Sequence, residues 1–108
     1  LFAGQITGVE GYMGNIATGA LAGINAARLL KGQVPLTLPE TTMLGALYRY
    51  LREADPRHFQ PMNANWGLVE PLEGGQAVRR SGGQKKDVKK QLLVERAQAD
   101  FSQWLREL

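Results

Sequence analysis

The residues best suited to binding a ligand lie in the first 31 positions, LFAGQITGVEGYMGNIATGALAGINAARLLK. Glycines stand at positions 4, 8, 11 and 14, around the start of a run whose apolar residues recur at helical spacing. Glycine lets a backbone approach a ligand closely, and the N–H groups at a helix N-terminus favour an anion or an electron-rich ring edge. The spacing of four and then three differs from that of the dinucleotide motif G-x-G-x-x-G. On the pattern alone, a ligand seat and a merely structural turn both remain open.

A second group of candidate binding residues is the basic run from Arg79 to Lys90. It holds six basic residues and one acid, so its local charge of +5 exceeds the +3 of the whole chain. Such a run either neutralises the phosphates of a polyanion or forms a solvated linker. The candidate nucleic-acid contacts are Arg79, Arg80, Lys85, Lys86, Lys89 and Lys90. No aromatic residue interleaves them, so stacking on unpaired bases is not indicated.

The remaining polar residues offer weaker candidates for chemistry. His58 is the only histidine, and it has no acidic or thiol partner at motif spacing. Asn63 and Asn65 either hydrogen-bond a substrate or cap their loop, and capping is the favoured interpretation. Cysteine is absent, which excludes a disulfide, a thiolate metal site and a cysteine nucleophile within these residues. We therefore predict neither a catalytic residue nor a metal ligand in this chain.

Three helices must position these groups. Apolar periodicity and end signals predict helices over 11–30, 42–54 and 86–108. Gly32 is the expected stop of the first helix, and Thr41 or Thr42 is the expected N-cap of the second. The polar face of the third helix, with Arg96 and Asp100 on it, is expected to face solvent. Leu1-Phe2-Ala3 is a short apolar stretch that we expect to enter the glycine turn as a strand.

The stretch 57–75 has neither a helical nor an alternating period and is long for a loop without structure. It contains Phe59, Met62 and Trp66, side chains that would be costly to leave in water. We therefore expect this loop to lie ordered against a surface.

These elements predict a mainly α fold for the chain by itself, with about three helices, one short N-terminal strand and a long ordered loop. The expected segments are 1–34 (strand, glycine turn and helix), 35–78 (second helix and loop) and 79–108 (basic hinge and C-terminal helix). Gly19 and Gly23 leave one side of the first helix almost without side-chain bulk, so we expect a neighbouring sheet or helix to approach it closely. Exposed small and aromatic residues also favour self-association of an isolated fragment.

The chain begins with Leu in a stretch typical of a buried strand, so we expect it to be a fragment of a longer protein. Neither a signal peptide nor a membrane-spanning run is visible, because polar residues interrupt the most apolar stretch. A cytoplasmic location fits the absence of cysteine.

Five motifs together resemble a known family. FAGQITGVEGY, GALAGINAARLL, TTMLGALYRY and ADPRHFQPMNANWG, followed by a closing basic helix, are similar to the C-terminal end of the TrmFO family, the bacterial folate- and FAD-dependent tRNA uridine C5-methyltransferases. The match covers essentially the whole chain. It extends more loosely to the related GidA (MnmG) tRNA-modifying flavoproteins, and the HFQPMNANWG segment favours TrmFO.

The resemblance implies a chain that completes an α/β, Rossmann-like FAD-binding domain built from both ends of a longer protein. It implies an enzyme that methylates C5 of a uridine in the tRNA T-loop, with FAD as cofactor and with methylenetetrahydrofolate and NAD(P)H as co-substrates. The reactive cysteines would lie upstream, so this fragment alone is expected to be inactive. Its expected partners are tRNA and the remainder of its own FAD-binding domain.

The same resemblance assigns cofactor-binding roles near the glycines. Gly4 and Gln5 would end a strand beside the flavin, while Glu10, Gly11, Tyr12 and Met13 would form the turn at the isoalloxazine ring. Two other classes of function remain open. One is a fragment of a GidA-like protein that modifies the wobble uridine, and the other is a non-enzymatic helical module for RNA binding or oligomerisation.

Overall fold

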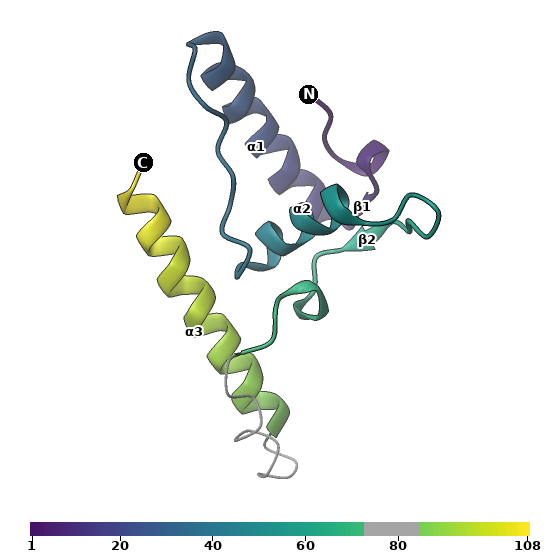
Figure 1. Ribbon diagram of the computed structural model, residues 1–108, viewed down its shortest axis with the longest axis vertical. Coiled ribbons are helices and arrows are strands. Elements are labelled where there is room, and N and C mark those ends of the chain that lie inside the picture. Colours follow the sequence, from purple (N-terminus) through teal and green to yellow (C-terminus); the bar gives the residue numbers. More distant parts are fainter. Residues whose placement is uncertain (73–84) are drawn as a thin grey trace.

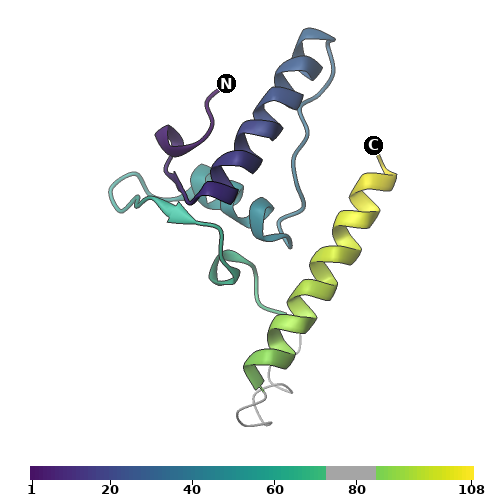
Figure 2. The same ribbon diagram turned by 180° about the vertical axis from the view of Figure 1, so that it is seen from behind.

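The computed structural model describes residues 1–72 and 85–108. It contains three α-helices, α1 (Tyr12–Leu30), α2 (Met43–Glu53) and α3 (Lys85–Arg106). The short elements are the 3₁₀ turns η1 (Gln5–Thr7) and η2 (Trp66–Leu68) and the two-residue strands β1 (Val9–Glu10) and β2 (Met62–Asn63). Both views place α1 and α3 on opposite sides of the connector that leads to α2 (Figures 1 and 2). The predicted mainly α fold with three helices is confirmed.

The strands differ from the sequence prediction of one short strand at residues 1–3. Leu1-Phe2-Ala3 has no regular structure, and Gly4 and Gln5 lead into η1 instead of ending a strand. Leu1 and Phe2 are 74% and 81% exposed, whereas a strand requires a partner for its backbone groups. The strand forms at β1, where Val9 pairs with Met62 in a parallel register. The observed sheet therefore joins the glycine turn to the loop after α2.

α1 begins directly after Gly11 and ends where the sequence signals indicate. Gly32 has φ of +71°, the left-handed conformation that ends a helix, and its N–H donates to Leu29 O at 3.0 Å. Only one face of α1 is buried, through Gly14, Thr18 and Leu21. Farther along the same helix, the Asn25 side chain holds the connector by two hydrogen bonds to the backbone of Leu36, at 2.6 and 3.1 Å.

α2 is the element on which the other parts pack. Its N-cap is Thr42, whose Oγ1 accepts a hydrogen bond from Gly45 N at 3.0 Å, as the sequence predicts for this pair of threonines. Gly45 lies so close to Pro39 that only a glycine fits there. Ala46 and Leu47 are fully buried.

The loop after α2 lies ordered against that helix, as predicted, over the described part that ends at Leu72. Val69 packs with Ala46 of α2 and Leu93 of α3 in one core cluster, and the partly buried residues around it are Trp66, Leu68 and Leu72. At the other end of the loop the Tyr50 hydroxyl donates to Gln60 O at 2.8 Å, and its ring stacks on Phe59 with 5.7 Å between centroids.

α3 is attached by polar contacts as well as by Leu93. The Arg96 guanidinium donates to Glu70 O and Pro71 O, and Thr41 Oγ1 donates to Asp100 Oδ2 at 2.6 Å. Helical periodicity predicts a solvent-facing position for Arg96 and Asp100, and this is wrong. Both side chains bond to segments outside α3, and the periodicity of α3 holds no information about those segments. No helix in the described part of the chain has the length and apolar character needed to cross a membrane.

Candidate functional site at the start of α1

The first turn of α1 presents backbone N–H groups without a cap. The first four N–H groups of an α-helix have no intrahelical acceptor, and here no side chain of the described residues caps them. No acidic residue lies in this turn. Tyr12 and Met13 are 91% and 79% exposed, so the turn faces outward. This arrangement suits a negatively charged or electron-rich group.

The turn keeps its shape through three glycines in a backbone conformation that other residues rarely adopt. Gly4, Gly8 and Gly11 have φ of +81°, +96° and +88°. A Cβ on Gly11 would also lie 2.9 Å from Asn63 Oδ1, and a Cβ on Gly8 would collide with the Phe59 ring. The glycines are therefore required both by backbone geometry and by the close approach of the loop after α2.

Asn15 connects two of the predicted site residues. Its Nδ2 donates to Gly11 O at 2.7 Å, while its Oδ1 would be 3.1 Å from a Cβ built on Gly4. That Oδ1 is buried and has no hydrogen-bond partner among the described residues. Gly4 and Gly11 therefore both lie next to the Asn15 side chain, although Gly4 does not end a strand.

The structure places the other predicted residues around this turn. Gln5 is exposed at the start of η1, and Glu10 is partly buried at the end of β1, where it pairs in register with Asn63. The sequence favours a loop cap over a substrate contact for Asn63, and in the structure its side chain lies against Gly11. Asn65 is the N-cap residue of η2, but its side chain makes no capping hydrogen bond there, and its Nδ2 donates to Asn63 O at 2.8 Å within the loop. No local signal in the sequence could show that Asn63 and Gly11 meet.

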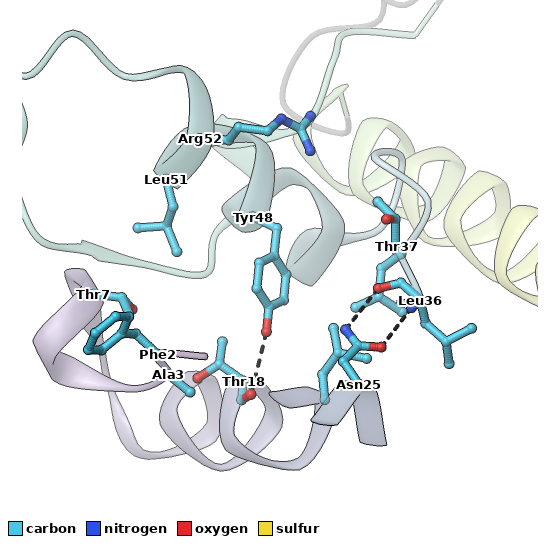
Figure 3. Close-up of a pocket in the computed structure, with 12 residues that line it drawn as sticks. Phe2, Ala3, Thr7, Thr18, Asn25, Leu36, Thr37, Tyr48, Leu51 and Arg52 are labelled. Carbon is cyan, nitrogen blue, oxygen red and sulfur yellow. Dashed lines mark hydrogen bonds between the residues drawn. The ribbon is translucent and has the colours of Figure 1, made fainter. Parts of the chain in front are cut away.

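A cavity of about 370 Å³ lies on the buried side of the same segment, between residues 2–7, α1, the connector and α2. In Figure 3, Tyr48 points from α2 toward Thr18 of α1, and Asn25 holds Leu36 at the cavity's other end. The Tyr48 hydroxyl donates to Thr18 O over a long 3.5 Å. Burial raises the pKa of Tyr48 above its ordinary value of 10.0, so this hydroxyl stays protonated at neutral pH.

The predicted nucleic-acid residues are only partly visible. Arg79 and Arg80 lie outside the described residues, and of Lys85 and Lys86 only the helical backbone is described. Lys89 and Lys90 are exposed on the first half of α3. His58 is exposed in the loop after α2, and within 1–72 and 85–108 no three His, Asp or Glu side chains gather as metal ligands do.

Comparison with known proteins finds a family that is similar to this glycine turn and helix. Residues 1–34 match the family described as GIDA, Glucose inhibited division protein A. This match covers η1, β1 and the whole of α1, the elements that form the uncapped turn.

More specific relatives match almost the whole chain. A protein of Geobacter sulfurreducens is 51% identical over 104 residues, and one of Streptococcus pneumoniae is 47% identical over 104 residues. Both are named methylenetetrahydrofolate–tRNA-(uracil-5-)-methyltransferase TrmFO. Each alignment covers 96% of this chain and 22% of the relative, so the chain spans about a fifth of the length of these proteins. The resemblance to TrmFO predicted from the sequence is confirmed.

Proposed function

We propose that this chain is the C-terminal part of a full-length enzyme of the TrmFO type. That enzyme would transfer a one-carbon unit from methylenetetrahydrofolate to C5 of a T-loop uridine in tRNA, using FAD and NAD(P)H, in the cytoplasm. The observation that carries the proposal is 51% identity over 96% of the chain to a protein with this name. By the resemblance, the reacting groups would lie elsewhere in that enzyme, and the share of this chain would be to help bind the cofactor and the tRNA.

The residues at the start of α1 fit an isoalloxazine ring. The uncapped N–H groups of the first turn face outward beside Tyr12 and Met13, and the absence of a Cβ on Gly11 lets Asn63 lie close beneath that turn. When bound, a reduced flavin supplies electrons and carries negative charge near N1 and the C2 carbonyl. The N–H groups of residues 12–14 would donate to that charge, and the aligned peptide dipoles of α1 would add to the effect.

Each predicted cofactor residue has a distinct part in this proposal. Gly11, Tyr12 and Met13 supply the turn and its N–H groups, and Glu10 orients the turn through β1. Gly4 approaches the Asn15 side chain closely, and Gln5 O accepts a hydrogen bond from Gly8 N at 3.0 Å, so both residues shape the segment that precedes the turn. The remainder of the FAD-binding domain would cover the residues that are exposed here, Leu1, Phe2 and Ile6 among them.

A pair of glycine variants tests the cofactor site in the full-length protein. Gly11→Ala places a Cβ at positive φ and against Asn63, so we expect less bound FAD and a paler purified protein. Gly32→Ala is the matched control: Gly32 also has positive φ, but it lies at the far end of α1 with nothing within 4 Å of its Cβ position. Equal FAD content in the two variants would refute the placement of the flavin at this turn.

The basic run is the proposed tRNA contact. Lys89 and Lys90 are exposed and adjoin Lys85 and Lys86 on α3, so several cations follow one another along the start of the helix. Lysine contacts with phosphates carry most of the salt dependence of nucleic-acid binding. We expect Lys89→Gln with Lys90→Gln to lower the slope of log K against log salt by roughly 1 to 2. Lys31→Gln, at the exposed end of α1, is the control, and an equal change in that variant would contradict the assignment.

The family match over residues 1–34 also supports a second candidate, a GidA-like protein acting on the wobble uridine. The two candidates differ in the modified position, which mapping the product in tRNA from cells with and without the gene would distinguish. A colourless full-length protein with salt-sensitive tRNA binding would instead favour a helical RNA-binding module.

A further inference from the structure

A second concave surface lies between α1 and α3, away from the glycine turn. It is a groove of about 550 Å³ whose walls are Ala20 and Ile24 of α1 and Ala97 and Phe101 of α3, and whose floor is formed by the connector and the start of α2. The two helices run along opposite sides of the connector (Figure 1). The groove is thus a long trough between two helices and not a closed chamber.

The lining of this groove is almost wholly apolar and is not covered by the described residues. Thr42 and Gln98 are the only polar residues among those that line it. Ile24 is 49% exposed and Phe101 is 38% exposed, and Phe101 stacks on Trp104 with 5.5 Å between ring centroids. A continuous exposed apolar lining of this kind is a candidate binding surface, and a trough between two helices accommodates the apolar face of a third.

The charges at one end of the groove restrict what can occupy it. Trp104 also borders an acidic hollow that contains Glu40, Asp100 and Glu107. Among the described residues, no basic side chain forms an ion pair with Asp100 or Glu107, whereas Glu40 pairs with Arg49 and Arg52. A cationic side chain at the Trp104 end would therefore favour the binding of a segment in the groove.

We propose that the groove holds an amphipathic helix from the remainder of the same full-length chain, with its apolar face on Ile24 and Phe101 and a basic residue near Asp100 and Glu107. This inference rests on the proposed function, in which the chain is part of a longer enzyme. In the relatives named TrmFO, the matched region covers 22% of the length and the other 78% lies outside it. Such a protein contains ample chain to supply the helix. The contact would fix α3, and with it the basic residues proposed to contact tRNA, relative to the cofactor turn on α1.

Thiol labelling of the full-length protein tests the occupant. Ala20→Cys places a thiol in the groove, and Ala99→Cys places one on the exposed surface of α3 as a matched control. Labelling at each site is followed by mass spectrometry of its peptide, relative to the same protein in denaturant. We expect the thiol of Ala20→Cys to react on the order of 100-fold more slowly than that of Ala99→Cys, because a packed site reacts only through local opening. The ratio should not depend on protein concentration.

Two outcomes would overturn the proposal. Protection that disappears on dilution would show that a second copy fills the groove, and fast labelling of the Ala20→Cys variant at all concentrations would show that the groove is open. Matching thermal unfolding of both variants verifies that the substitutions leave the fold intact. A yellow Ala20→Cys protein with a reactive groove thiol would refute this inference and leave the proposed function standing, whereas a colourless protein would count against the proposed function itself.

Discussion

Two glycines inside helices give opposite predictions for the same substitution. In α2, a Cβ on Gly45 would lie 1.9 Å from Pro39 O, 2.6 Å from Pro39 C and 2.8 Å from Thr42 Oγ1. In α1, a Cβ on Gly19 would have nothing within 4 Å. Gly19→Ala should therefore show the ordinary helix preference for alanine, and Gly45→Ala should show a collision with backbone that cannot rotate away.

The size of each effect follows from these contacts. Replacing glycine by alanine inside a helix gains about 1 kcal/mol, so Gly19→Ala should stabilise the chain by that amount. At Gly45 the new methyl must displace Pro39 O, which accepts hydrogen bonds from Thr42 N at 3.1 Å and Thr42 Oγ1 at 2.6 Å. Overpacking costs about 1–3 kcal/mol and a disturbed N-cap about 0.5–2 kcal/mol. After the helix gain of about 1 kcal/mol, Gly45→Ala should destabilise by roughly 0.5–4 kcal/mol.

Urea denaturation of the 108-residue chain, followed by far-UV circular dichroism, measures both changes. The midpoint should rise for Gly19→Ala and fall for Gly45→Ala at an unchanged slope. A Gly45→Ala chain as stable as the parent would refute the close approach of Pro39 to α2. In the full-length protein, the face of α1 that carries Gly19 is expected to be covered, so the gain from Gly19→Ala should disappear there.

Two further predictions concern side chains that join the helices. Thr41→Val removes the hydrogen bond to Asp100 and should speed amide hydrogen exchange in the second half of α3 by about tenfold, in line with a loss of about 1–2 kcal/mol; unchanged exchange would show that this contact does not hold α3. Burial raises the pKa of Tyr48 above 10.0, so its contribution to stability is present below pH 10 and is lost as pH rises through the folded-state pKa. Stability measured from about pH 9 to 12 should accordingly fall less steeply in Tyr48→Phe than in the parent, and parallel curves would contradict the burial of this hydroxyl.

The helices could be predicted from the sequence because their signals are local. Gly32 ends α1 through its own backbone conformation, and Thr42 caps α2 through a hydrogen bond to a residue three positions later. The periodicity of each helix likewise depends only on residues within it. These features require no knowledge of what the helix packs against.

The features that the sequence could not show all join distant segments. β1 pairs with a strand far along the chain, Val9 with Met62, and a two-residue strand has no detectable alternation. Helical spacing identifies the polar face of α3 and so predicts that Arg96 and Asp100 face solvent. It cannot identify the backbone carbonyls and the Thr41 hydroxyl that bond to these side chains. The contact between Gly11 and Asn63 belongs to the same class.

That last contact changes what the candidate site depends on. Three positive-φ glycines could form an uncapped helix start in many ways, but here Asn63 lies against Gly11, Phe59 against Gly8 and Val9 beneath Gly14. The loop after α2 therefore determines which way the first turn of α1 faces. This loop is in turn held by Tyr50 and by the cluster around Ala46 and Val69. The shape of the proposed cofactor site therefore depends on α2 and its loop as well as on the glycine motif. A substitution in the core of α2 should consequently alter the site without touching any residue that lines it.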